Sequence, residues 1–128
     1  MEFHPNELWI IYDPNTNTGK QTKAYALTIT DHIFELNVSK DRLTTTLWKE
    51  IINMLDVKPW EIMNHDHPEF KKIGDNSFTM QGWLDILLNT PTIVKAPIAI
   101  SNKRAVLCNK PTDILKLPLK RAFRHNKT

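Results

Sequence analysis

Short runs of branched and aromatic residues alternate with amphipathic stripes along this chain, and this alternation restricts the fold more than any other feature. The first such run extends from Leu8 to Tyr12 and predicts a buried strand. A cluster of turn-forming residues at 13–19 predicts a loop, and residues 20–27 suit a helix. A second strand is predicted at 33–38.

The middle of the chain has a helical pattern. Residues 43–55 carry an apolar stripe of helical period, and Thr44 is a candidate N-cap because its hydroxyl can accept a bond from a first-turn amide. Shorter helices are predicted at 59–63 and 68–73, since each begins with a proline. Gly74 stops the second of them.

The last part of the chain returns to strands. A further helix begins at Thr79 and ends before Pro91, which cannot continue it. Apolar runs at 98–100 and 105–107 flank a polar turn and predict a hairpin, and 111–117 is a last short helix. The whole order predicts an α/β fold, a mixed sheet with helical cover, for which a thioredoxin-type sandwich is a natural candidate.

Length and charge narrow the class of protein. The 128 residues argue for one domain, and no apolar run approaches the length of a membrane helix. Because the start has no signal-peptide pattern, we expect a soluble cytoplasmic protein. The chain has 17 basic and 14 acidic residues, and five of the basic ones follow Asp113 with no acid among them. The rest therefore carries 12 minus 14, or −2, and the basicity belongs to the C-terminal end.

A single cysteine, Cys108, excludes an internal disulfide, a Cys-x-x-Cys redox pair and a cysteine-based zinc site. Two interpretations of this thiol stay open. Lys110 is near enough in sequence to lower its pKa and make it a redox thiol, while the apolar residues before it indicate a quiet packing position at a strand end.

The loop after the first strand carries a hint of phosphate binding. Gly19 and Lys20 resemble the end of a phosphate loop, but Pro14 stands where its first glycine belongs. Gln21 stands where a serine or threonine must hold magnesium. A plain turn that caps a helix is the favoured interpretation, although an anion at the helix start stays open.

Two polar segments are weaker candidates. His65, Asp66 and His67 have the residue types of a metal cluster, but further ligands would have to come from elsewhere, so we favour an exposed turn and predict no metal. Residues 116–127 could attract nucleic acid or an acidic partner, although a solvated terminus is favoured.

From about Trp9 to Leu115 the pattern resembles the arsenate reductase ArsC family, the thioredoxin-fold group that also contains Spx-type regulators. The resemblance implies a thioredoxin-like (glutaredoxin-like) mixed sheet in a single domain at 1–117, with a helical insertion at about 43–90 and a basic tail at 118–128. The segments that carry it are Tyr12-x-Pro14, Leu43-Thr44 through Leu55-x-Val57-x-Pro59-Trp60-Glu61-Ile62-Met63, Pro68-x-Phe70-Lys71-x-Ile73-Gly74, Leu84 to Pro91, Pro91 to Ile98, Lys103 to Val106 and Pro111-x-Asp113-Ile114-Leu115.

In reductases of this family a first-loop cysteine attacks arsenate, and glutathione and glutaredoxin reduce the adduct. The resemblance places Thr16 at that cysteine position. It places Asn64, Ala96 and Asn109, the last beside Lys110, at the positions of three oxyanion-binding arginines. Pro97 matches a proline that thioredoxin-fold proteins hold cis beside the active loop; an ordinary strand-start proline is the alternative. The candidate binding residues are Asn15, Thr16, Asn17, Thr18, Gly19, Lys20 and Pro97.

Thr16 in place of the cysteine, and Asn64, Ala96 and Asn109 in place of the three arginines, are four substitutions at functional positions. They predict a protein that has lost arsenate reduction and acts as a binding or regulatory module for a protein partner. A threonine hydroxyl is nearly un-ionised at neutral pH and cannot enter thiol exchange. The first alternative is a thiol oxidoreductase that uses Cys108, and only that case would require glutathione or glutaredoxin. The second is an Spx-like contact with RNA polymerase. We expect a monomer with no cofactor and no membrane contact.

Overall fold

The computed structural model describes residues 7–73 and 78–117 and divides the chain into two compact units. One unit is Met1–Asn37 with Ala96–Thr128, and the other is Val38–Lys95. The predicted stop at Gly74 and the basic tail at 118–128 lie outside the described residues.

The first unit is a four-stranded mixed sheet in the order β2-β1-β3-β4. Its central strand β1 (Leu8–Tyr12) pairs in parallel with β2 (Ile33–Asn37) and antiparallel with β3 (Ile98–Ser101). β3 continues into β4 (Arg104–Leu107), which confirms the predicted hairpin. Asn102 and Lys103 form its two-residue turn, both with positive φ, as a tight hairpin requires.

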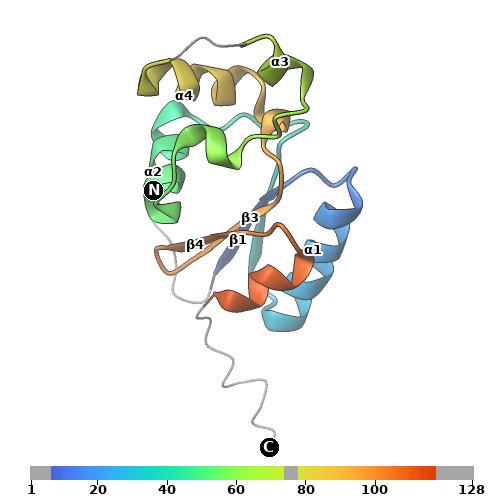
Figure 1. Ribbon diagram of the computed structural model, residues 1–128. Coiled ribbons are helices and arrows are strands. Elements are labelled where there is room, and N and C mark those ends of the chain that lie inside the picture. The colour runs from blue at the N-terminus through green and yellow to red at the C-terminus, as the bar shows by residue number, and fades with distance from the viewer. Residues whose placement is uncertain (1–6, 74–77, 118–128) are drawn as a thin grey trace, which may run out of the picture. The chain divides into compact units, whose positions relative to one another are not determined.

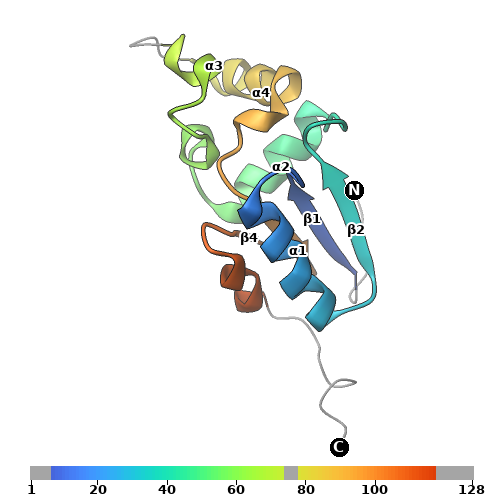
Figure 2. The ribbon, with the colours of Figure 1, turned by 90° about the vertical axis from the view of Figure 1, so that its right-hand side faces the viewer.

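One face of this sheet is covered by α1 (Asn17–Ile29) and the 3₁₀ helix η3 (Pro111–Lys116), which lie side by side (Figures 1 and 2). α1 is the crossover between the parallel strands β1 and β2 and is longer at both ends than the predicted 20–27. The buried residues between these layers are Leu8, Ala26, Ile29, Ala99, Cys108, Ile114 and Leu117.

The second unit is helical, and its range includes the 43–90 segment of the expected insertion. α2 (Thr45–Leu55) packs on α4 (Met80–Asn89), and α3 (Pro68–Lys71) is a single turn. The 3₁₀ helices η1 (Pro59–Ile62) and η2 (Pro91–Ile93) complete it. Its buried apolar side chains include Trp48, Ile51, Ile52, Ile62, Met63, Trp83, Leu84, Leu87 and Ile93.

Side-chain caps set the starts of the longer helices. Thr44 accepts a bond from the Leu47 amide at 3.1 Å, which confirms the predicted N-cap, and Thr79 caps α4 through Gly82 in the same way. Over residues 7–73 and 78–117, none of the helices combines the length and apolarity needed to cross a bilayer.

Candidate functional site

The loop between β1 and α1 is a tightly hydrogen-bonded turn centred on Thr16. The Thr16 hydroxyl donates to the Asp13 carbonyl at 2.9 Å and accepts from the Gly19 amide at 3.0 Å. The Asp13 carboxylate in turn accepts from the Asn15 amide at 2.9 Å. The residue that resemblance places at the cysteine position is therefore the N-cap of α1, and both functions of its hydroxyl are in use.

Gly19 allows α1 to start this close to the preceding strand. A Cβ atom at this position would lie 2.2 Å from the Asp13 carbonyl oxygen, a distance at which the backbone must shift. Lys20 is exposed, and its amide donates to the Thr16 carbonyl at 3.0 Å. The close packing therefore explains the glycine at position 19 without a bound phosphate, in agreement with the interpretation of this segment as a turn that caps a helix.

A polar network beside this turn joins β1, α1 and β2, and the sequence pattern did not reveal it. The Tyr12 hydroxyl donates to the Glu35 carboxylate at 2.5 Å, and Lys23 of α1 lies 3.0 Å from the same carboxylate. Burial, followed by the bond to Glu35, raises the pKa of Tyr12. The Tyr12 bond, assisted by Lys23, lowers the pKa of Glu35. The network therefore holds a protonated phenol against a carboxylate and ties α1 to the edge strand β2.

Cys108 lies in the core of the first unit. Its side chain is 0% exposed, and its amide donates to the Pro97 carbonyl at 2.7 Å. Burial, followed by the nearby Asp113 carboxylate, raises the pKa of the thiol to about 12. The expectation that Lys110 lowers this pKa is wrong: the pKa is raised, and among the described residues the one cation that opposes the loss of hydration is Lys116.

The three positions at which the resemblance expects arginines hold uncharged residues, and Pro97 lies next to one of them. Among the described residues there is no cis peptide bond, so the expected cis form of Pro97 is wrong. Pro97 instead stands directly before β3, where a trans proline without an amide hydrogen is tolerated. Ala96 is half-buried and Asn109 is exposed, whereas Asn64 lies in the other unit and accepts from the Asp66 amide at 2.9 Å.

The two histidines of the 65–67 segment have separate partners. His65 Nε2 bonds the Trp60 carbonyl at 2.9 Å, while His67 Nδ1 accepts from the Glu69 amide at 3.1 Å. His67 Nε2 lies 3.4 Å from the Thr92 hydroxyl. Within the described part of the chain, no three His, Cys, Asp or Glu side chains gather as a metal site would need.

Comparison with known proteins identifies the fold. No protein-family model and no curated protein matches the chain. A candidate arsenate reductase from Yersinia pestis has a similar structure, with a TM-score of 0.80 and 16% identity over 87% of this chain and 100% of its own. An arsenate reductase from Vibrio cholerae has a TM-score of 0.75 at 15% identity, covering 88% of this chain and 98% of its own.

A candidate ArsC-family-related protein from Bacteroides fragilis is also similar, with a TM-score of 0.74 and 15% identity over 88% of this chain and 98% of its own. These likenesses confirm the predicted α/β fold of thioredoxin type and the resemblance to ArsC proteins at the level of the fold. A shared fold does not determine the activity, which depends on the residues that this chain places at the site.

Proposed function

We propose that this chain uses the fold of arsenate reductases without their thiol chemistry and acts as a binding module for another protein. The observation that carries the proposal is the environment of the chain's single thiol, that of Cys108. Cys108 is 0% exposed, and burial raises its pKa to about 12. A nucleophilic cysteine needs both access and a lowered pKa, and Cys108 has neither.

The hydroxyl of Thr16 is a poor substitute for a thiol. It donates to the Asp13 carbonyl and accepts from the Gly19 amide, so an attack on a substrate would break the cap of α1. An alcohol also needs a general base to become a nucleophile, and it cannot form the mixed disulfides on which thiol-dependent reduction depends.

Oxyanion binding lacks its usual donors as well. The resemblance places Asn64, Ala96 and Asn109 where arginines hold the oxyanion in reductases of this fold. A planar guanidinium binds an oxyanion through two parallel hydrogen bonds, which neither an amide nor a methyl group can replace. We therefore expect arsenate to bind weakly to this chain.

The β1–α1 turn supports a binding role. Its polar side chains Asn15, Thr16 and Asn17 are exposed, while the bonds around Asp13 hold the backbone in one conformation. A surface that is ordered before binding loses little conformational entropy when a partner docks. We place the partner's contact at this turn.

An assay with arsenate, glutathione, glutaredoxin, NADPH and glutathione reductase tests the loss of chemistry, because the reductase couples each glutathione disulfide formed to the oxidation of one NADPH. The V. cholerae arsenate reductase is the positive control, and Cys108→Ala is the matched variant. We expect no arsenate-dependent NADPH oxidation from either form of this chain. Turnover that Cys108→Ala abolishes would favour the alternative of a Cys108 oxidoreductase, and turnover that survives Cys108→Ala would refute the proposal outright.

A photo-crosslinking residue tests the binding half. Introduced at Asn17, it should yield one defined protein adduct, whereas the same residue at the exposed Thr112 of η3 should not. The same adducts at both positions, or none at Asn17, would contradict a partner at the turn. An adduct with RNA polymerase would identify the partner as the Spx-like alternative expects.

A further inference from the structure

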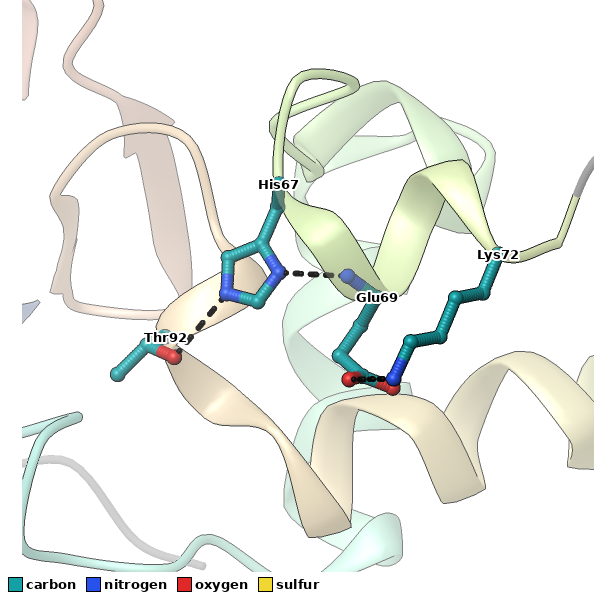
Figure 3. Close-up of polar contacts among 4 residues, drawn as sticks. All are labelled: His67, Glu69, Lys72 and Thr92. Carbon is teal, nitrogen blue, oxygen red and sulfur yellow. Dashed lines mark hydrogen bonds and ion pairs between the residues drawn. The ribbon is translucent and has the colours of Figure 1, made fainter.

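The turn before α3 is capped by an imidazole ring. His67 is the N-cap of α3, and its Nδ1 accepts a hydrogen bond from the Glu69 amide at 3.1 Å (Figure 3). Serine, threonine, aspartate and asparagine usually fill this position, and their acceptor oxygens persist across the neutral range. An imidazole nitrogen accepts a bond only while it carries no proton.

The contacts of the ring fix its tautomer. Because the Glu69 amide can only donate, Nδ1 is unprotonated and the ring proton lies on Nε2. Nε2 faces the hydroxyl of Thr92 in η2 at 3.4 Å (Figure 3). The neutral ring therefore bridges α3 and η2, two segments separated by the whole of α4 in the sequence.

η2 contributes no titratable side chain. The nearest carboxylate of α3, Glu69, bonds Lys72 at 2.9 Å and is directed away from the ring (Figure 3). The titratable side chains of α3 and of the turn before it are His65, Asp66, Glu69, Lys71 and Lys72.

We propose that His67 is a proton-sensitive latch for α3. A proton taken up at Nδ1 removes the acceptor of the Glu69 amide and turns two donors toward each other. The latch is therefore closed while the ring is neutral, and it opens when Nδ1 takes up a proton.

Opening of the latch changes an aromatic surface. Phe70 of α3 stacks on His65 at 4.1 Å between ring centroids and on Trp83 of α4 at 6.3 Å. Trp83 is 7% exposed while these contacts hold. Trp60 and Phe78 also contact the Trp83 ring, at 5.6 and 5.1 Å between centroids. Release of α3 therefore withdraws one of three aromatic neighbours, and protonation changes this aromatic cluster independently of the binding role proposed for the β1–α1 turn.

Amide hydrogen exchange of the full chain by NMR tests this latch. The Lys71 and Lys72 amides bond the His67 and Pro68 carbonyls at 3.0 and 3.2 Å. After correction for intrinsic exchange, their protection should fall about tenfold between about pH 7.5 and about pH 5.5, the effect of losing one N-cap. His67→Asn, whose amide oxygen keeps the cap, should stay protected at both values, and His67→Ala should be poorly protected at both.

His65→Asn is the matched control, because it removes the neighbouring ring and leaves the cap; it should keep the wild-type response. Unchanged wild-type protection on acidification would overturn the proposal. So would an equal loss in His67→Asn, or a response abolished by His65→Asn. The ring ¹⁵N shifts give a readout that needs no variant: a proton on Nδ1 rather than Nε2 in the neutral form would also overturn it.

Discussion

Alkylation of native Cys108 by iodoacetamide should be about a thousandfold slower than alkylation of an ordinary cysteine. The thiolate is the reactive form, and burial raises the pKa of this thiol from 9.0 to about 12. Three pKa units reduce the thiolate fraction at neutral pH by 10 × 10 × 10, or about a thousandfold. Because the side chain is 0% exposed, the reagent also needs a local opening of the core, which slows the reaction further.

The assay follows intact mass during alkylation from about pH 5 to about pH 9, the range in which an ordinary thiol near 8.5 begins to ionise. We expect the native rate to rise in proportion to hydroxide concentration with no plateau. In denaturant the rate should return to that of a free thiol, since burial is the cause of the shift.

A matched variant supplies the contrast. Thr16→Cys in the Cys108→Ala background places one exposed thiol at the start of α1, beside the Gly19 amide that now bonds the threonine. A helix N-terminus stabilises a thiolate, so this variant should react fast and reach its plateau below about pH 8.5. The reasoning is refuted if native wild-type protein reacts as fast as a free thiol or reaches a plateau below about pH 9.

Two further predictions concern the turn and the network beside it. Gly19→Ala places a Cβ 2.2 Å from the Asp13 carbonyl oxygen and should lower the free energy of unfolding by about 1–3 kcal/mol. In Gly82→Ala the new Cβ meets only the Phe78 side chain, at 3.1 Å, so this variant should be neutral or stabilising. Equal urea midpoints for the two variants would contradict this prediction. The lowered pKa of Glu35 means that its bond to Tyr12 stabilises the fold above the unfolded-state pKa and is lost as the pH falls through the lowered value. The difference in urea midpoint between wild type and Glu35→Gln should therefore shrink on acidification, and a difference independent of pH would show that the carboxylate charge contributes nothing.

The fold was accessible from sequence because its determinants are local. The apolar stripe at 43–55 and the Thr44 cap predict α2 almost to the residue, since both the period and the cap are properties of adjacent positions. The start of α1 was missed because Asn17, Thr18 and Gly19 are poor helix formers. The cap by Thr16 was the signal that could have located it.

The properties of the candidate site depend on contacts between residues that are far apart in the sequence, which local patterns do not predict. Lys110 is near Cys108 in sequence, but the pKa of the thiol follows its burial in a core built from strands and helices far apart in the chain. The bond between Tyr12 and Glu35 joins residues 23 apart and needs the parallel register of β1 and β2, which no local pattern specifies. Pro97 matches a family motif, but its peptide bond is trans, and a match of residue type does not specify the isomer.

The most direct test of the central claim is the intact mass of the native chain after incubation with arsenate and glutathione. A protein without usable thiol chemistry keeps its unmodified mass, because Cys108 is buried and Thr16 offers only an alcohol. A glutathione mixed disulfide on native Cys108 that forms only when arsenate is present would contradict the account.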